Sequence, residues 1–308
     1  MTVPQLVREA YILPVRLIRI FDSEYADLME TKSSDSMTRR QVNSFRRTIY
    51  EYFDRYGRKL AWRDTDDPYR ILVSEIMLQQ TQVERVITKY HDFIGQFPDF
   101  TVLAAAPLRL ILAAWQGLGY NRRAIWLRGI AVRTLNEFNG VLPSSPEILL
   151  TFPGIGRSTA GALAAFAFRK PAVFIETNIR RVFIHFFFCE KERVKDAEIL
   201  PYVQRTLDRP RVREWYYALM DYGVMLRSLD SNPNRRSAHY ARQSPFIHSD
   251  RQIRGSILRI LLETPVLSED QLLEAVGKDE RLTKKLIAQL VREGFLHRSE
   301  AGFTISRS

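Results

Sequence analysis

The sequence predicts a mainly α-helical protein that ends in a small α+β domain. Apolar residues recur at three- and four-residue spacing through most of residues 37–229, as they do on one face of a helix. Prolines and glycines interrupt this spacing often, which predicts short helices joined by tight loops. No series of alternating apolar and polar residues, which would predict strands, occurs in that range.

The helical pattern, its breaks and the composition divide the chain into four parts. Residues 1–36 are interpreted as an N-terminal extension. Residues 37–229 form the helical domain, and the pattern places helices there over 42–56, 69–78, 82–97, 107–115, 122–138 and 213–226. Residues 230–254 are polar and basic and contain two prolines, which is the composition of a linker.

Residues 255–308 are the fourth part, and their pattern predicts three helices followed by a hairpin. Ser268 and Gln271 have the spacing of a capping box at the start of the second helix, and Gly277 is placed to end it. Three helices and a hairpin in this order predict a winged-helix-like domain. A small helical module that binds another protein is the alternative.

The charge balance indicates an anionic partner. The chain has 308 residues, with 46 lysines and arginines against 35 acidic residues and a net charge of +11. Such an excess is typical of proteins that bind a polyanion such as nucleic acid. Ribosomal, membrane-surface and merely basic proteins share it.

The rest of the composition excludes several kinds of site. The single cysteine, Cys189, excludes an intramolecular disulfide and, in practice, a cysteine-based metal or iron–sulfur site. The five histidines lack the spacing of a zinc site. No apolar run approaches the roughly 20 residues of a membrane span, and the N-terminus lacks a signal-peptide pattern. We therefore expect a cytoplasmic protein without a membrane partner.

The stretch "FPGIGRSTAGAL" predicts a turn between two helices. Gly154 and Gly156 permit a tight turn and a close approach of the backbone to a ligand. The amides at the next helix start, near Arg157, Ser158 and Thr159, suit a phosphate. This predicts a helix-hairpin-helix that holds the DNA backbone without reading sequence. A plain turn is the alternative.

Glu75 lies inside a strongly apolar predicted helix. It shares one face with Leu72 and Gln79, so we expect it to be partly buried. Partial burial raises the pKa of a glutamate, as a general acid requires. The polar residues Gln79, Gln80 and Thr81 then interrupt the helix, and exposed amides in a loop can fill a gap in a duplex. The alternative for Glu75 is an ordinary glutamate on a helix surface.

Glu176 in "FIETNIRRVF" precedes Thr177 and Asn178, both good helix caps. A carboxylate at a helix N-terminus is stabilised as the anion, so we expect Glu176 to stay charged while Glu75 can hold a proton. Two carboxyl groups with different protonation suit the cleavage of a glycosidic bond. A simple capping interaction is the alternative for Glu176.

Five stretches in this order resemble the helix-hairpin-helix DNA glycosylase superfamily and, within it, the MutY-type adenine DNA glycosylases. They are "WRDTDDPYRILVSEIMLQQTQV", "WQGLGYNRRA", "FPGIGRSTAGAL", "IETNIRRV" and "LMDYGVM", and the resemblance covers roughly residues 40–229. It implies a fold of two α-helical subdomains with the active site in the cleft between them. It also implies double-stranded DNA with a mispaired or damaged base as the partner, and we expect a monomer associated with the nucleoid.

The resemblance implies roles for individual residues. Glu75 matches the glutamate that protonates the departing purine and later handles water, and Glu176 stands where the family has its catalytic aspartate. Gln79 matches the glutamine wedged into the duplex where the base has left. Trp62 and Arg63 match the start of the base pocket.

Further residues match the family's DNA-binding and cleft motifs. Gly154, Gly156 and Ser158 match the hairpin that holds DNA. Ser158 stands where bifunctional relatives carry a Schiff-base lysine, which implies a monofunctional glycosylase. Tyr120 falls in the motif that lines the cleft, and Asn178 follows the catalytic acid as in the family.

The chain departs from the family at several places. Glu176 is one methylene longer than the family's aspartate, and Asn121 stands where the family has a second tyrosine. No cysteine follows "LMDYGVM", which predicts a member without the family's iron–sulfur cluster. Fewer than 60 residues remain for a C-terminal domain, too few for the family's Nudix-like one, and the basic helix Lys284–Arg292 is expected to add DNA contacts or to be a solvated helix face.

Together these features predict a monofunctional glycosylase of base excision repair that removes a mispaired base, most simply adenine opposite 8-oxoguanine or guanine. The departures at Asn121 and Glu176 leave other bases open, such as thymine or uracil opposite guanine, or hypoxanthine. A DNA-binding protein on the same fold without catalytic activity is the remaining alternative.

Overall fold

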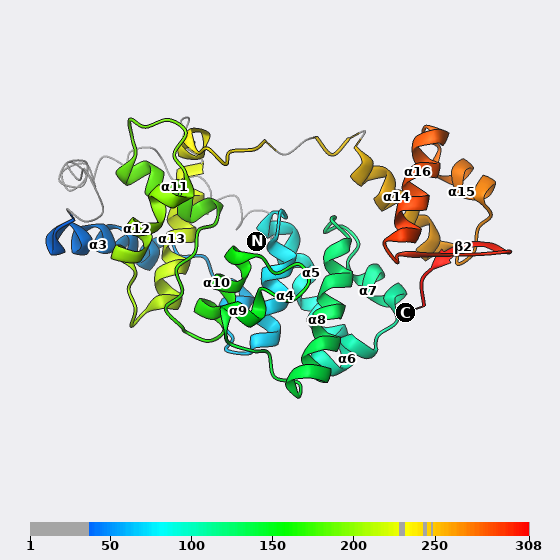
Figure 1. The fold of residues 1–308 in the computed structure, drawn as a ribbon, viewed down its shortest axis with the longest axis horizontal. Helices are drawn as coiled ribbons and strands as arrows, with labels where there is room; N and C mark the ends of the chain where they lie inside the picture. Colours follow the sequence, from blue (N-terminus) through cyan, green and yellow to red (C-terminus); the bar gives the residue numbers. More distant parts are fainter. Residues whose placement is uncertain (1–36, 228–231, 243–244, 248, 308) are drawn as a thin grey trace, which may run out of the picture. The chain divides into compact units, whose positions relative to one another are not determined.

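The structure is a computed structural model that describes residues 37–227, 232–242, 245–247 and 249–307 (Figure 1). The predicted extension, residues 1–36, lies outside the described residues. The described part is mainly helical, with one small two-stranded sheet, as the sequence predicts. None of the described helices combines the length and the apolar character needed to cross a membrane.

Contacts between residues divide the chain into two compact units. Unit 1 comprises residues up to Arg63 together with Arg157–Ala241, and unit 2 comprises Asp64–Gly156 together with Arg242–Ser308. The chain therefore passes between the two units three times. The C-terminal residues cluster with residues 64–156, a grouping that local sequence patterns do not indicate.

Unit 1 is a bundle of helices around an aromatic core. Its elements are α3 (Arg39–Tyr56), η3 (Ala61–Arg63), α10 (Arg157–Phe166), α11 (Thr177–Phe187), α12 (Asp196–Thr206), α13 (Val212–Arg227) and η4 (Pro233–Arg236). Helix α13 packs against both α11 and α3 (Figure 1). At the centre, the ring of Phe45 lies 5.1–5.7 Å from the rings of Phe183, Phe186 and Trp215.

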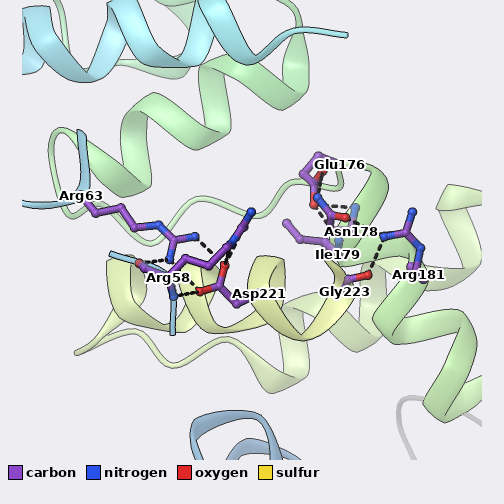
Figure 2. Close-up of polar contacts among 8 residues, drawn as sticks. All are labelled: Arg58, Arg63, Glu176, Asn178, Ile179, Arg181, Asp221 and Gly223. Carbon is purple, nitrogen blue, oxygen red and sulfur yellow. Dashed lines mark hydrogen bonds and ion pairs between the residues drawn. The ribbon is translucent and has the colours of Figure 1, made fainter. Parts of the chain in front are cut away.

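A buried carboxylate connects two segments of unit 1 that lie far apart in the sequence. Asp221 on α13 has a side chain that is 2% exposed. It accepts hydrogen bonds from Nε of Arg58 at 2.6 Å and from Nη1 and Nη2 of Arg63 at 2.8 Å each (Figure 2). Burial alone would raise the pKa of Asp221, but the hydrogen bonds and charges of the two arginines outweigh it and hold the pKa below its ordinary value. The bonds of Arg58 and Arg63 to Asp221 thereby fix residues 58–63 against α13.

Unit 2 contains the remaining helices and the sheet. Its elements are α4 (Pro68–Leu78), α5 (Val83–Gln96), α6 (Phe100–Ala105), α7 (Leu108–Ala114), α8 (Arg122–Phe138), α9 (Pro146–Leu149), α14 (Asp250–Glu263), α15 (Glu269–Val276), α16 (Glu280–Arg292), β1 (Leu296–Ser299) and β2 (Gly302–Ile305). All six helices predicted from apolar spacing are present in the two units. Helices α6 and α12 were not predicted, because α6 is too short to show a period and α12 contains Pro201.

The C-terminal part has the predicted order of three helices and an antiparallel hairpin, in which Leu296 pairs with Ile305. The hydroxyl of Ser268 accepts from the backbone N–H of Gln271, and the side chain of Gln271 accepts in return from the N–H of Ser268, which confirms the capping box. Gly277 ends α15 in the left-handed conformation, with φ +57°. Helix α14 begins at Asp250, five residues before the predicted domain boundary. The boundary was placed too late because the first turn of this helix is polar and has the composition of a linker.

Replacing Asp221 by asparagine is expected to lower the free energy of unfolding at pH 7 by about 3–5 kcal/mol, because two buried guanidinium groups lose their counter-charge. The pKa of Asp221 is depressed in the folded state, so its stabilisation is present above the unfolded pKa and is lost as the pH falls through the folded value. The difference in the free energy of unfolding between Asp221→Asn and wild type, measured by urea unfolding, should therefore become smaller at acid pH. Glu137 is exposed and pairs with Arg133 on the same helix, so Glu137→Gln is the control. It should change the free energy of unfolding by less than about 0.5 kcal/mol. An equal effect of both substitutions would contradict the role of Asp221.

Candidate functional site

Glu176 is the N-cap of α11. Its Oε1 accepts hydrogen bonds from the backbone N–H groups of Asn178 and Ile179, both at 2.7 Å, and its Oε2 accepts from Nδ2 of Asn178 at 3.3 Å (Figure 2). The capping interaction that the sequence offered as the alternative for Glu176 is present, because its carboxylate, and not Thr177 or Asn178, reaches the free amides of the first turn. The capping role and the candidate catalytic role therefore fall on the same side chain.

Arg181 sets the orientation of Asn178. Its Nη1 donates to Oδ1 of Asn178 at 2.6 Å and to the carbonyl of Gly223 at 2.5 Å (Figure 2). Its Nε donates to Oδ1 of Asn232 at 3.0 Å. Because Arg181 can only donate, the amide oxygen of Asn178 faces it and the amide nitrogen faces Glu176. Burial lowers the pKa of Arg181 to about 10, so it stays charged at neutral pH.

Gly223 allows α13 to approach the first turn of α11. A Cβ at Gly223 would lie 2.5 Å from the carbonyl oxygen of Asn178 and 2.6 Å from its Cβ. Any side chain at this position would displace the turn that holds Glu176. The sequence "LMDYGVM" therefore contributes to the site through its glycine as well as through Asp221.

The pKa of Glu176 departs from the expectation. Burial of the carboxyl raises the pKa and outweighs the amides of Asn178 and Ile179 and the charges of Arg181 and Arg180, which lower it. The predicted stabilisation of the anion by the helix start is present, but the net direction is upward. Ionisation of Glu176 consequently depends on the hydrogen-bond donors around it.

Glu75 lies on α4 in unit 2. It is half-buried between Ser74 and Ile76, which are both fully buried. The expected partial burial is therefore confirmed, since Glu75 shares its face with the fully buried Leu72.

A buried arginine organises the chain after α4. Nη1 of Arg123 donates to the carbonyls of Ile76, Met77 and Gln79 at 2.6–2.9 Å. Nη2 donates to Oγ1 of Thr81 and to the carbonyls of Leu118 and Gly119 at 2.9–3.1 Å. Burial lowers its pKa to about 10, which leaves the guanidinium charged at neutral pH. This one side chain thereby ties the end of α4 to the loop before α8.

The predicted wedge residues form a rigid turn around this arginine. Nε2 of Gln79 donates to the carbonyl of Gly154 at 3.0 Å, and Oγ1 of Thr81 donates to the carbonyl of Leu118 at 3.3 Å. Gln80 is exposed and has a left-handed backbone, with φ +55°. Of the three side chains, only Gln80 is fully presented to solvent.

Tyr120 and Asn121 lie next to this turn. Tyr120 also has a left-handed backbone, with φ +46°, and Asn121 precedes the first turn of α8 without a side-chain cap bond. Both line a pocket of about 260 Å³ in unit 2 together with Gln79 and Gln80. The structure thus brings four of the predicted residues together.

The hairpin residues differ in how strictly they need glycine. Gly154 has φ +74°, and a Cβ there would lie 2.4 Å from the Trp126 ring, whereas nothing lies within 4 Å of a Cβ at Gly156. Arg157 begins α10 and is exposed, and Ser158 and Thr159 are half-buried beside it in the same turn. The helix start near Ser158 is confirmed.

Trp62 and Arg63 have structural contacts. Trp62 is 4% exposed. The guanidinium of Arg63 is bonded to Asp221 and lies 4.5 Å from the centre of the Tyr217 ring. Their predicted place in a base pocket stays a prediction.

The segment after α13 does not fit an iron–sulfur cluster. It contains no cysteine, and a cluster needs several thiolates. Its described residues instead bind α11 and the loop after it: Nδ2 of Asn234 donates to the carbonyl of Thr177 at 2.8 Å, and Arg236 donates to the carbonyls of Phe188 and Cys189. Nor do the described residues contain a group of three or more His, Cys, Asp or Glu side chains that could hold a metal ion.

Sequence reasoning missed Arg123, Arg181 and Asp221. Each is a charged residue within an apolar helical pattern, and that position is the signal that could have indicated a buried charge with a fixed partner.

The fold and these motifs define a class of DNA repair protein. Residues 73–201 match the family model of the HhH-GPD superfamily of base excision DNA repair proteins. A solved thymine-DNA glycosylase has the same fold, with a TM-score of 0.55 and 24% identity, over 62% of this chain and 90% of that one. A trapped endonuclease III–DNA intermediate superposes with a TM-score of 0.50 and 18% identity, over 62% of this chain and 86% of that one.

Sequence relatives narrow this class. An adenine DNA glycosylase of Mycobacterium tuberculosis is 31% identical over 275 residues, which cover 79% of this chain and 88% of the relative. One of Mycolicibacterium smegmatis is 32% identical, over 80% of this chain and 92% of the relative. One of Buchnera aphidicola is 38% identical over 61% of this chain, and the match spans 54% of that relative's length. The chain belongs to the HhH-GPD superfamily and, within it, to the family of the adenine DNA glycosylases.

Replacing Gly154 by alanine is expected to lower the free energy of unfolding by roughly 1–3 kcal/mol, because the new Cβ meets the Trp126 ring on a left-handed backbone. Replacing Gly156 by alanine is the matched control and should change it by less than about 0.5 kcal/mol. Urea unfolding of the three proteins measures the difference. Equal stabilities for the two variants would show that Gly154 is not constrained.

Replacing Glu176 by glutamine is expected to stabilise the protein progressively as the pH rises. A raised folded pKa contributes stability that is complete below the unfolded pKa, near 4.3, and is lost as the pH rises through the folded value. Glutamine keeps the cap acceptor and does not ionise. The free energy of unfolding of Glu176→Gln relative to wild type should therefore rise as the pH increases above the unfolded pKa, whereas Glu176→Asp should follow wild type. A flat or falling difference would contradict the raised pKa.

Proposed function

We propose that this protein hydrolyses the N-glycosidic bond of adenine mispaired with 8-oxoguanine or guanine in duplex DNA. The observation that carries this proposal is the similarity to adenine DNA glycosylases along 79% of the chain, with a carboxyl group at each position where the family has a catalytic acid. The chain would act in base excision repair, at the nucleoid, as a monomer.

The two carboxyl groups divide the chemistry in this proposal. Protonated Glu75 gives its proton to a ring nitrogen of the adenine, and the C1′–N bond electrons leave with the base. The carboxylate of Glu176 stabilises the cationic sugar that remains. Glu75 then takes a proton from water, whose oxygen attacks C1′, so that the products are free adenine and an abasic site.

Neighbouring residues supply DNA contacts in this proposal. The helix start at Arg157, Ser158 and Thr159 offers backbone amides to a phosphate, and the Gln79–Thr81 turn meets the duplex where the base has left the stack. Ser158 offers no amine for a Schiff base, so the enzyme leaves the abasic strand intact. No iron–sulfur cluster takes part, since the contacts of Asn234 and Arg236 hold the segment that carries it elsewhere in the family.

Replacing Glu75 by glutamine is expected to slow adenine excision by about 10²–10⁴-fold, because the general acid is lost. Single-turnover assays on a duplex with adenine opposite 8-oxoguanine, followed by alkaline cleavage of abasic sites, measure the rate. The exposed Glu84 replaced by glutamine is the control and should excise at the wild-type rate. Equal rates for Glu75→Gln and wild type would remove Glu75 from the mechanism.

A second candidate is the removal of another base, which two observations favour. Asn121 lines the pocket where the family has a tyrosine, and Glu176 is longer than the family's aspartate. A panel with thymine or uracil opposite guanine, and with hypoxanthine, tests it for wild type and Glu176→Asp. Excision of adenine alone by wild type would reject this candidate, and excision of no base would reject both.

A further inference from the structure

We infer that the C-terminal module, residues 250–305, forms part of the DNA-binding surface through Arg251 and Arg254 of α14, which complete a pocket for one nucleotide. This inference rests on the proposed function only in taking DNA as the partner.

The pocket joins two segments of unit 2 that are distant in the sequence. One wall holds the wedge turn and the start of α8, and the other holds α14 of the C-terminal module. Its lining residues are Gln79, Gln80, Tyr120, Asn121, Arg122, Arg123, Trp126, Arg251 and Arg254. The pocket therefore exists only with the module in place.

Arg251 is the closest link between the two walls. Its Nη1 donates to the hydroxyl oxygen of Tyr120 at 2.6 Å, and its guanidinium carbon lies 5.2 Å from the centre of the Tyr120 ring. Both residues are half-buried. A guanidinium held against an aromatic ring at a pocket edge is placed to meet a phosphate whose base lies along the ring.

Ion pairs and hydrogen bonds hold the module against α7 and α8. Arg109 on α7 donates to the carbonyls of Leu261 and Leu262 in the last turn of α14, where a cation meets the negative helix end. Glu293 accepts from Arg122 at 2.9 Å and from Arg254 at 2.5 Å. These contacts fix the position of α14 and hence of Arg251.

The lining has the chemistry of a nucleotide site. Tyr120 and Trp126 offer aromatic faces for a base, and Gln79, Gln80 and Asn121 offer amides that bond to base edges. Among the described residues that line the pocket, four are arginines and none is acidic. Glu293 pairs with Arg122 and Arg254, so an anion is expected to meet Arg251. A volume of about 260 Å³ lies just below the roughly 300–1,000 Å³ of small-ligand sites, which suits a single base.

Backbone conformation also sets this pocket apart. Gln80 and Tyr120 both have left-handed φ values, +55° and +46°, although neither is glycine. Such conformations are strained for side-chain-bearing residues and gather at ligand sites. Here they turn two polar side chains toward the same pocket.

The inferred contribution comes from α14, whereas the sequence singled out the basic helix Lys284–Arg292. Lys284 of α16 is paired with Glu280 at 2.6 Å and with Glu269 at 3.8 Å, so its charge is largely balanced within the module. Arg251 bonds to the Tyr120 hydroxyl at the edge of the pocket.

The test measures binding of the full chain to a duplex that carries a stable abasic-site analogue, by fluorescence anisotropy over a series of salt concentrations. Arg251→Ala is expected to raise Kd about tenfold and to lower the slope of log Kd against log salt by about one. Arg259 lies on the same helix, is exposed and pairs with Glu263. Arg259→Ala removes the same charge and is the matched control, expected to change Kd less than about twofold.

Arg251→Ala leaves the Glu293 ion pairs intact, so the module should stay in place, and Arg251→Lys should recover part of the affinity. Wild-type affinity and salt slope in Arg251→Ala, or an equal loss in Arg259→Ala, would overturn the inference. Adenine excision by wild type reports on the proposed function separately. If wild type excises adenine and Arg251→Ala binds DNA as tightly as wild type, this inference alone is rejected. If Arg251→Ala binds DNA more weakly and wild type excises no base, the proposed function alone is rejected.

Discussion

The hydrogen bonds of the buried Arg123 hold together the candidate DNA-binding residues of unit 2, which are Gln79, Gln80 and Tyr120. The two Nη atoms of Arg123 donate to six oxygens of α4, of the turn after α4 and of the loop before α8, all in residues between 76 and 119. A lysine has three donors from one point and cannot reach this set, so the planar fork of arginine is required. The positions of Gln79, Gln80 and Tyr120 all follow from where this one charge is buried.

The helices of the domain follow from the sequence, because apolar spacing and helix-ending residues are local. The sequence offered capping as one of two roles for Glu176 and named Thr177 and Asn178 as good caps too, since it does not show which side chain reaches the free amides. Arg181 and Asp221 were missed because their most distant partners lie 51 and 163 residues away in the sequence. The joining of the C-terminal module to residues 64–156 likewise depends on long-range ion pairs, such as Arg122 with Glu293, that leave no local pattern.

The segment that follows α13 shows how hydrogen bonds take over a structural task. Arg236 donates to carbonyls at the C-terminal end of α11, where a cation is favoured, and Asn234 donates to the carbonyl of Thr177 at the other end. The two ends of the helix that carries Glu176 are thus held by one short segment. Asn232 extends this support to Arg181 and, through Asn178, to the carboxylate itself.

The hydrogen bond between Gln79 and the carbonyl of Gly154 has a consequence for how DNA is searched. If Gln79 enters a duplex, this bond breaks, and the free energy of that exchange, on the order of 1 kcal/mol, opposes entry at every site. Under the proposed wedge role, this free energy favours the withdrawn side chain on undamaged DNA, and a site that offers a vacant space favours its release. The same bond connects the wedge turn to the hairpin, so that a change in one alters the conformational equilibrium of the other, and by linkage the reverse holds equally.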